Sequence, residues 1–296
     1  MKKSLKGPIC LTLCAIFWGM AFSAQSSAMD HVEPYTFVFL RSAITCLALL
    51  ISMPLLNRLN PANNAPTASN RRHLAVGALC GAFLVLATIL QQVGLVTTTT
   101  AKSGFITALY IIIVPILGIF LGRKPRAAIW LGVLVSLIGL YFLCWQGTLN
   151  VNVGDLFTLG SAVVFAVHIQ LIDRLGGNLN SIKLSAIQFG AAAVIACAVM
   201  LLFETPNLDG ILACWTDILY VAIFSGALGY TLQIVGQKST DPTLASLIMC
   251  LESVFAALGG WLVLGEALSV REILGCALML SASVIALLPG RKRAAQ

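Results

Sequence analysis

Ten stretches of about 20 mostly apolar residues follow one another along this chain of 296 residues, and they leave little else to fold. The hydrocarbon core of a bilayer is about 30 Å thick, and a helix needs roughly 20 apolar residues to cross it. The composition agrees, because only 10% of the residues are charged, against about 25% in a typical soluble domain. The sequence therefore predicts an all-α integral membrane protein with ten transmembrane helices.

The apolar stretches divide evenly between the two halves of the chain. Those of the first half are Pro8–Ala28, Pro34–Leu56, His73–Val96, Ala101–Leu121 and Ala127–Trp145. Those of the second half are Asp155–Asp173, Ile182–Phe203, Ile211–Val235, Thr243–Leu264 and Val270–Leu288. The first stretch also resembles a signal peptide, with basic residues before an apolar run. Because nine further spans follow it, we interpret it as an uncleaved first helix.

The positions of lysine and arginine predict how the spans are oriented. With the N-terminus inside, 15 of the 18 basic residues fall in internal segments, namely Lys2, Lys3, Lys6, Arg58, Arg71, Arg72, Arg123, Lys124, Arg126, Arg174, Lys183, Lys238, Arg291, Lys292 and Arg293. Cytoplasmic loops carry such an excess of basic residues. We therefore expect a multi-pass protein of the bacterial cytoplasmic (inner) membrane with both termini in the cytoplasm. This orientation accounts for the net charge of +7 without nucleic acid as a partner.

A polar phrase occurs twice in the otherwise apolar chain, as LQQVGLVTTTTAKS at residues 90–103 and LQIVGQKSTDPTLAS at residues 232–246. The two copies align at an offset of 142 and then, after one extra residue, of 143, while the first helices of the two halves align at an offset of 147. The equivalent pairs include Gln91 and Gln233, Thr97 and Thr240, Trp18 and Phe165, and Arg41 and Gln188. We therefore predict two repeats of five helices, residues 1–147 and 148–296.

An odd number of helices in each repeat has a physical consequence. If the first helix runs from inside to outside, the sixth must run from outside to inside, so the repeats are inverted copies. Inverted repeats are typical of secondary transporters, whose substrate site lies near the membrane midplane and opens to either side as the repeats rock. Gln91 would then lie near the external end of one helix and Gln233 near the internal end of its copy, as two mouths of one pathway.

Several segments resemble one known family. They are WGMAF at 18–22, PYTFVFLR at 34–41, SGFITALYIIIVPILGIFLGRKP at 103–125, WLGVLVSLIGLYFL at 130–143 and LESVFAALGGWLVLGEAL at 251–268. Together they resemble the EamA-type transporters of the drug/metabolite transporter superfamily over nearly the whole chain. The resemblance implies a ten-helix inverted-repeat fold and export or exchange of small metabolites, such as amino acids or aromatic compounds.

The chain departs from the family pattern at two places. Glu252 is followed by Ser253 where the family often has proline, so a proline-induced break is not expected there. Gly122 is followed by Arg123 where the family often has glutamate, while Gly265-Glu266 keeps the pattern. These departures leave the predicted fold unchanged and put a generic coupling mechanism in question.

Two charged residues fall inside predicted spans. Glu252 lies near mid-membrane in the ninth span, where an ionisable residue costs several kcal/mol and is by default a functional hypothesis. Its carboxyl suits proton coupling or a cationic substrate, and the alternative is a structural hydrogen bond to a neighbouring helix. Arg41, in the second span, could hold a substrate carboxylate or snorkel to the interface. We favour a structural role, in which Arg41 pairs within the bundle.

Other polar residues of the spans are candidates for the pathway. Gln91 and Gln233 must satisfy their amides inside the bundle, whereas the threonine run after Gln91 is expected to end a helix. His168 is the buried histidine candidate, since His31 and His73 fall at loops, and it could titrate or simply donate to a neighbouring carbonyl. Asp173 and Arg174 are expected to form an interfacial pair.

Aromatic residues could form the walls of a substrate cavity, although core packing is the common role of each one. The candidates are Trp18, Phe22, Tyr110, Tyr230 and Trp261. Pro115 predicts a kink in the fourth span. The predicted pathway set is thus Trp18, Gln91, Tyr110, His168, Tyr230, Gln233 and Glu252.

No cofactor and no metal are predicted. Cys10 and Cys14 lie one helical turn apart, but a metal site needs three or four ligands. The expected partners are a small-molecule substrate and the lipid bilayer, while proton or ion coupling and a homodimer stay open. The chain lacks the GxxxxGK[ST] sequence of ATP-driven pumps. An integral membrane enzyme and a non-transporting receptor are the rival hypotheses, and a secondary transporter, not an enzyme, is the prediction.

Overall fold

The computed structural model describes residues 5–59, 69–98, 100–144, 151–264 and 268–287. The helices of the first half are α1 (Lys6–Ala28), α2 (Pro34–Leu59), α3 (Asn70–Leu95), α4 (Thr100–Ala108), α5 (Tyr110–Phe120) and α6 (Ala127–Cys144). Those of the second half are α7 (Val153–Leu175), α8 (Ser181–Phe203), α9 (Leu208–Ala213), α10 (Trp215–Tyr220), the π-helix η2 (Val221–Tyr230), α11 (Thr231–Gln237), α12 (Pro242–Met249), α13 (Glu252–Leu264) and α14 (Val270–Leu287).

These elements form ten apolar helical crossings. Within the described ranges, nine helical segments are long and apolar enough to span a membrane, and the shorter apolar segment Ala127–Leu143 is the tenth. Three crossings consist of more than one helical element. The fourth crossing joins α4 and α5, the eighth joins α10, η2 and α11, and the ninth joins α12 and α13. The all-α, two-repeat membrane fold is thus confirmed. Trp145 and Leu288, the predicted ends of two spans, lie outside the described residues.

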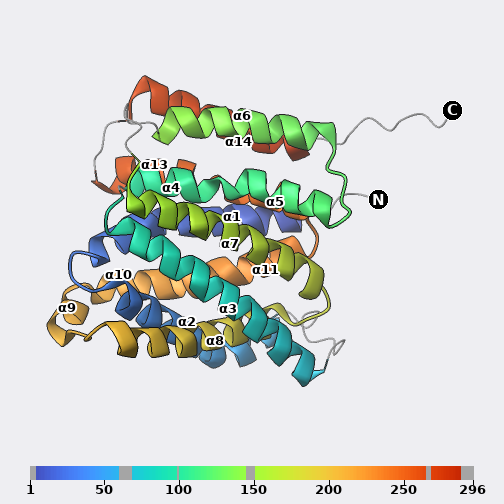
Figure 1. The fold of residues 1–296 in the computed structure, drawn as a ribbon. Helices are drawn as coiled ribbons and strands as arrows, with labels where there is room; N and C mark the ends of the chain where they lie inside the picture. Colours follow the sequence, from blue (N-terminus) through green and yellow to red (C-terminus); the bar gives the residue numbers. More distant parts are fainter. Residues whose placement is uncertain (1–4, 60–68, 99, 145–150, 265–267, 288–296) are drawn as a thin grey trace.

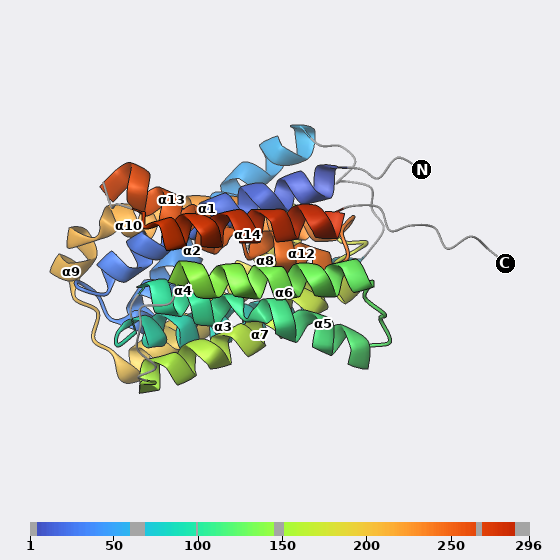
Figure 2. The ribbon, with the colours of Figure 1, turned by 90° about the horizontal axis from the view of Figure 1, so that it is seen from above.

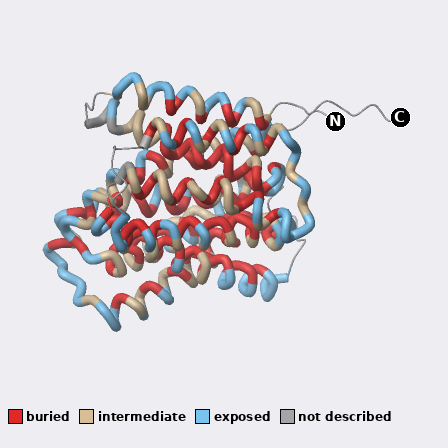
Figure 3. The backbone as a smooth tube through the Cα atoms, turned by 45° about the horizontal axis from the view of Figure 1, so that its top comes forward, coloured by how far each residue is buried: buried red, intermediate tan, exposed pale blue. Residues whose placement is uncertain are grey.

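The distribution of polar and apolar side chains is that of a protein in lipid. Large apolar side chains face outward, with Phe120 83% exposed and Ile51 79% exposed, while glutamines and an arginine are buried between the helices. Figure 3 shows the buried residues where the helices face one another and the exposed residues on outer faces and loops. Polar groups that cannot meet lipid must therefore find partners, or a pathway, inside the bundle.

The inverted repeat is visible as one contact formed twice. We call the end of the bundle where α1 begins the N-terminal end and the opposite end the distal end. At the N-terminal end Gly7 packs so closely on Gly236 and Thr240 that a side-chain carbon would collide with them, and at the distal end Gly154 packs in the same way on Gly94 and Thr97. Gly7 and Gly154 are equivalent at the offset of 147, and their partners are equivalent at 142 and 143. α1 and α7 accordingly run in opposite directions (Figure 1).

The last helices of the two repeats pack on each other. α6 and α14 lie side by side along one edge of the bundle, and α2 and α8 pair on the opposite side (Figures 1 and 2). Gly139 of α6 and Gly275 of α14 face each other, and an added Cβ on Gly139 would lie 2.8 Å from the Gly275 carbonyl oxygen. Small residues allow such close helix contacts in membranes, where lipid supplies no hydrophobic drive to associate.

The fourth crossing is broken, but not at the proline. α4 ends at Ala108 and α5 begins at Tyr110, because the amide of Leu109 bonds three residues back to Ile106 and that of Ile112 bonds back to Leu109. Pro115 lies inside α5. The break at Leu109 comes from local three-residue hydrogen bonding, and the kink expected at Pro115 stays a prediction.

The ninth crossing is broken as well, although its sequence lacks the proline. α12 ends at Met249 and α13 begins at Glu252, and the amides of Leu251 and Ser253 bond three residues back, to Ile248 and Cys250. As expected, no proline causes this break; it arises from the three-residue hydrogen bonds. At the offset of 143 Leu109 is equivalent to Glu252, the residue just after this break, so both repeats interrupt the same helix within two residues of the same place.

The eighth crossing differs from its prediction in two ways. Ile211, its predicted first residue, belongs to the short helix α9, and the membrane-length segment starts at Trp215 and ends at Gln237. The middle of this segment is the π-helix η2, whereas its copy in the first repeat is the regular helix α3. Wide π turns are uncommon and frequently occur at functional sites.

Candidate functional site

A narrow cavity lies inside the bundle where both repeats meet. About 30 Å³ of it admits the centre of a water molecule, which is room for about two waters. A metabolite would need the helices to move apart. The lining residues are Trp18, Phe22, Gln25, Arg41, Gln91, Thr107, Tyr110, Phe165, Ile169, Ser225, Tyr230, Gln233 and Glu252.

The cavity lies on the pseudo-twofold axis between the repeats. Three pairs of equivalent residues line it from both sides: Trp18 with Phe165, Phe22 with Ile169, and Gln91 with Gln233. A site that receives the same positions from two inverted repeats can present similar walls to either side of the membrane. Transporters of inverted-repeat build place their substrate site at this junction.

The two broken helices meet at the cavity. Tyr110 is the first residue of α5 and Glu252 the first of α13, and the Tyr110 hydroxyl donates to Oε1 of Glu252 at 3.3 Å. Both side chains are buried. Among the described residues, Glu252 forms no ion pair. A buried carboxyl with a single weak donor is chemically free to bind a proton or a cation.

Arg41 faces the cavity beside a glutamine. Its Nη1 donates to Oε1 of Gln25 at 2.7 Å, and Gln25 is held in turn by a donation from its own Nε2 to the Ala21 carbonyl. Arg41 Nε is buried and has no acceptor among the described residues. The expected structural pairing thus takes the form of a neutral amide contact, and no carboxylate neutralises the guanidinium within the described ranges.

The π-helix positions one aromatic wall. The Trp18 indole donates to the Ser225 carbonyl of η2 at 3.2 Å, and its ring lies 4.8 Å from that of Tyr230. An added Cβ on Gly229 would lie 2.7 Å from Trp18 Nε1, so glycine is needed for this close approach. The wide turn of η2 therefore offers a backbone acceptor to a residue of the first repeat.

The two predicted glutamines line one cavity instead of two mouths. Gln91 is buried and donates to the Thr107 hydroxyl at 3.2 Å, and Gln233 is buried with its Oε1 unpartnered among the described residues. Their helices cross near the centre of the bundle, and this crossing brings the two glutamines together. The position of each glutamine along its own helix could not predict that. α3 ends at Leu95, so Thr97 and Thr98 follow the helix, as expected, and Thr99 lies outside the described residues.

Three other predicted residues lie away from the cavity. His168 is fully buried behind the wall, where its Nε2 contacts Oε1 of Gln188 at 3.2 Å and its ring meets the edge of Tyr230. His73, expected in a loop, is buried in the first turn of α3, and its Nε2 accepts from the amide of Asn180. Trp261 is 51% exposed and cannot be a cavity wall.

Sequence reasoning missed several lining residues, and one signal could have found some of them. Phe165 and Ile169 are the repeat equivalents of Trp18 and Phe22, so the offset alone would have added them. Gln25 is a polar residue within an apolar span, as Gln91 is. Nothing in the sequence marks Thr107 or Ser225, which depend on how the crossing helices meet.

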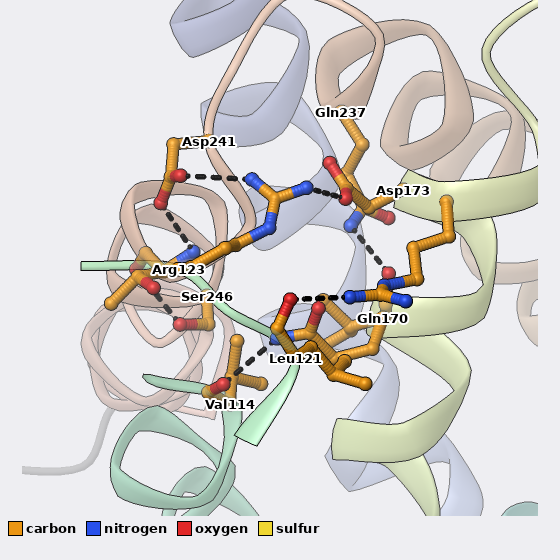
Figure 4. Close-up of polar contacts among 11 residues, drawn as sticks. Val114, Leu121, Arg123, Gln170, Asp173, Gln237, Asp241 and Ser246 are labelled. Carbon is orange, nitrogen blue, oxygen red and sulfur yellow. Dashed lines mark hydrogen bonds and ion pairs between the residues drawn. The ribbon is translucent and has the colours of Figure 1, made fainter. Parts of the chain in front are cut away.

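An ion-pair network lies at the N-terminal end of the bundle. Arg123, just after α5, contacts the carboxylates of Asp173 at the end of α7 and Asp241 before α12 (Figure 4). Arg174 donates to the Leu121 carbonyl at 2.6 Å. The expected pairing of Asp173 with Arg174 is thus replaced by two separate contacts with the segment after α5. Arg123, the departure from the family pattern, joins three helices, while Glu266 lies outside the described residues.

Two further hydrogen bonds join helices near this network. Gln170 of α7 donates to the Val114 carbonyl of α5 at 2.8 Å, and Gln237 of α11 donates to the Ile169 carbonyl of α7 at 3.1 Å. Figure 4 shows the Gln170 contact beside the Arg123 network. Lys238 follows α11 and donates to the Leu179 carbonyl, and burial lowers the pKa of its amine.

The distal end carries a different ion pair. Lys102 of α4 binds Asp155 of α7 at 2.5 Å, and the Thr98 hydroxyl donates to the other oxygen of the same carboxylate at 3.0 Å. Asp155 also belongs to a capping box with Asn152 at the start of α7. The α4–α5 crossing is therefore fastened to α7 at both ends.

A second hollow of about 400 Å³ lies on the other face of α1. Its lining residues are Met20, Ser23, Ala24, Ser27, Asp217, Tyr220, Ala256 and Gly259. Ser23 and Ser27 are exposed, and no repeat equivalents face each other across it. The central cavity, although smaller, is the candidate site because it combines buried charge with the pseudo-twofold axis.

Comparison with known proteins agrees with this arrangement. The EamA-like transporter family matches the chain twice, over residues 5–145 and 152–288. An uncharacterized transporter of Archaeoglobus fulgidus is 29% identical over 289 residues, which is 96% of this chain and 86% of that protein. The threonine/homoserine exporter RhtA of Escherichia coli strain K12 is 26% identical over 180 residues, 59% of each chain.

A solved crystal structure shares the fold. It superposes with a TM-score of 0.77 over 94% of this chain and 95% of that chain, at 19% sequence identity. Likeness at this identity speaks for the fold alone. The family match, which covers both halves, goes further: this chain belongs to the EamA-like transporter family.

Proposed function

We propose that the protein is a secondary transporter that moves small metabolites across the bacterial cytoplasmic membrane by alternating access. The observation that carries this proposal is the central cavity, which both inverted repeats line and at which both broken helices meet. Discontinuous helices at the midplane supply backbone and side-chain groups to a substrate. The repeats themselves are proposed to be residues 1–147 and 148–296.

Alternating access needs contacts that close one end and can separate. The Arg123 contact with Asp241 joins the segment after α5 to the start of α12, so rocking of one broken helix against the other would break it. Both residues are partly exposed, and exposed ion pairs are worth only about 0–1 kcal/mol. Such a contact can stabilise a closed end without locking it.

The proposal also covers the orientation of the protein in the membrane, the direction of transport and the coupling of transport to protons. The N-terminal end of the bundle faces the cytoplasm, with both chain termini there, because the basic residues gather in its segments. Export is the proposed direction, supported by the name of the relative RhtA, a threonine/homoserine exporter. Glu252 is the proposed proton-coupling group, since it is buried at the cavity with one hydrogen-bond donor. The names of the relatives also support transport over an enzyme activity.

Counterflow in proteoliposomes tests this function. Purified protein is reconstituted, the vesicles are loaded with a mixture of unlabelled metabolites, and uptake of each labelled compound is followed with and without a pH gradient. We expect exchange of at least one compound and a change in net uptake when the gradient is applied. Glu252→Gln should exchange substrate without responding to the gradient, while Asp155→Asn, at a buried carboxylate away from the cavity, should still respond.

Two outcomes would contradict parts of the proposal. Net uptake by Glu252→Gln that still follows the pH gradient would exclude the coupling role of Glu252. A reporter fused to the C-terminus that is active outside the cell would exclude the proposed orientation. Vesicles that exchange none of the compounds, with folded protein present, would contradict transport itself.

A further inference from the structure

The π-helix η2 is a feature of the second repeat that the first repeat does not share. Its equivalent in the first repeat lies within the regular helix α3. The walls of the central cavity differ accordingly. Ser225 and Tyr230 of η2 line the cavity together with Gln233 of α11, whereas α3, which the structure describes over its whole length, contributes Gln91 alone.

The wide turn of η2 explains why Ser225 and Tyr230 share one face. In an α-helix each residue adds about 100°, so residues five apart point about 140° away from each other. In a π-helix residue i is bonded to residue i+5, so residues five apart lie on nearly the same side. The equivalents of this pair at the offset of 142, Phe83 and Thr88, lie in a regular helix. Both are described residues, and neither lines the cavity.

Two side chains of the first repeat donate to backbone carbonyls of η2. Thr45 Oγ1 of α2 donates to the Ala222 carbonyl at 2.7 Å, and the Trp18 indole of α1 donates to the Ser225 carbonyl at 3.2 Å. Thr45 is fully buried and does not itself line the cavity. Side chains that reach into the ladder of backbone hydrogen bonds distort a helix. These two contacts therefore favour the wide turn over a regular α-helix.

Each donor approaches η2 over a glycine. An added Cβ on Gly226 would lie 2.3 Å from Thr45 Oγ1, and one on Gly229 would lie 2.7 Å from Trp18 Nε1. A side chain at either position would therefore push the donor away from its carbonyl. The two glycines and the two donors form one matched set.

The first repeat lacks both donors of this set. At the offset of 147, Thr45 is equivalent to Ala192 and Trp18 to Phe165, and neither equivalent has a side-chain donor. Ser161 does donate to a carbonyl of α3 at 2.9 Å, so a single added hydrogen bond leaves a helix regular.

The first repeat also lacks the two glycines. At the offset of 142, Gly226 is equivalent to Leu84 and Gly229 to Ala87. Leu84 and Ala87 pack in one apolar cluster with Phe165. Where the donors and the glycines are both replaced by apolar residues, the helix is regular.

We infer that Thr45 and Trp18 are positioning residues of the central cavity. Their hydrogen bonds hold η2 in its π form, and that form turns Ser225 and Tyr230 toward the cavity together. A regular helix here would keep only one of these two side chains at the wall. Loss of the hydrogen bonds should then weaken substrate binding, an effect that rests on the transport function proposed above.

A bifunctional thiol reagent tests whether the two positions share a face. Ser225→Cys and Tyr230→Cys are combined in a background without native cysteines and treated with dibromobimane, which fluoresces strongly only after both of its arms react. We expect this pair to be bridged. Adding Thr45→Val and Trp18→Phe should lower the yield at least about fivefold, since one net hydrogen bond shifts an equilibrium by about that factor. Thr45→Val alone serves if the combined variant does not fold, and Thr45→Ser, which keeps the hydroxyl, should be bridged like the parent.

Matched controls come from the other repeat. Phe83→Cys with Thr88→Cys, the equivalent pair on α3, should not be bridged in any background. Ser161→Ala removes a buried hydrogen bond of the same kind, to the Ala87 carbonyl, and should leave bridging of the η2 pair unchanged. Each cysteine is also introduced alone and labelled with monobromobimane, so that a change in reach is separated from a change in geometry.

Exchange measurements report the consequence for the site. For a compound that counterflow identifies, we expect Thr45→Val to raise the KM of exchange about fivefold. Thr45→Ser and Ser161→Ala should keep the wild-type KM. Because Thr45 does not line the cavity, a change in KM that follows its hydroxyl must act through η2.

The outcomes separate the positioning role from the transport function. Equal bridging with and without the two donors, or no bridging of the η2 pair in the parent, would overturn the positioning role. A KM that Thr45→Val leaves unchanged, although bridging falls, would overturn its effect on the site. If no compound exchanges, the transport function fails, while bridging still decides whether Thr45 and Trp18 hold η2.

Discussion

The hydroxyl of Tyr110 donates to the carboxylate of Glu252, across the line where the two repeats meet. Each residue is the first of a helix that resumes after a break, α5 in one repeat and α13 in the other. The contact therefore joins the equivalent broken crossings of the two repeats at the cavity. A movement of one crossing against the other must stretch or break it.

Removing this hydrogen bond should lower the stability of the folded protein measurably. We expect Tyr110→Phe to lower the free energy of unfolding by about 1 kcal/mol, the usual net value of one buried hydrogen bond. In the Glu252→Gln background the loss should be smaller, because the bond to a carboxylate is already gone. Thermal unfolding of the four proteins of this cycle checks the coupling. Tyr141→Phe, at a tyrosine 46% exposed, is the control, and strictly additive effects of the two mutations would contradict a direct coupling.

The Arg123 network should govern access from the N-terminal end. We expect Arg123→Gln to raise labelling of a cysteine placed at Ser225, in a background without native cysteines, by an impermeant thiol reagent added at that end. A network worth about 1 kcal/mol shifts a two-state equilibrium roughly fivefold. Asp241→Asn should act in the same direction, because Asp241 connects Arg123 to α12.

The distal ion pair supplies the matched control. Lys102→Gln, which breaks the contact with Asp155, should not increase labelling from the N-terminal end. If Arg123→Gln is labelled at the wild-type rate from that end, or if Lys102→Gln is labelled as fast, the network does not act as the closing contact.

Gln233, a glutamine of the cavity, should affect substrate binding more than the stability of the protein. We expect Gln233→Leu to raise the KM of exchange about tenfold, since a lost hydrogen bond to a polar substrate is worth about 1 kcal/mol or slightly more. Gln237→Leu is the comparison, because Gln237 is buried and donates to the Ile169 carbonyl but does not line the cavity. It should destabilise the protein with little change in KM. Equal changes in KM for both variants would argue against a role of Gln233 in binding.

The close contact of α6 and α14 should not tolerate a side chain. In Gly139→Ala the new Cβ would lie 2.8 Å from the Gly275 carbonyl oxygen and 2.8 Å from Met279 Cγ, so the helices must separate. Overpacking of this kind costs about 1–3 kcal/mol, which a lower unfolding temperature would report. Gly104→Ala meets no atom within 4 Å and should unfold at or above the wild-type temperature. Wild-type stability of Gly139→Ala would show that the two helices are not held this closely.

The repeat offset indicates more of the residues that line the cavity than the type of each single residue does. Trp18, Gln91 and Gln233 were predictable because each lies in a span that the offset pairs with its copy, and Glu252 because a carboxyl at membrane depth is costly. Their roles in transport stay predictions. The offset also implied Phe165 and Ile169, which line the cavity beside their equivalents. His168, chosen for its chemistry alone, lies behind Tyr230 instead.

By itself the sequence determined the all-helical membrane fold, the two repeats and their inversion, because span length and helix parity depend only on apolar runs along the chain. Only the tertiary structure decided where helices break and which side chains share a cavity. No proline marks the breaks at Leu109 and at Cys250–Leu251, because they arise from three-residue hydrogen bonds. The partners of Arg41 and Arg123 also depend on which helices cross. These helices are distant in the sequence, so a local sequence pattern does not show which of them meet.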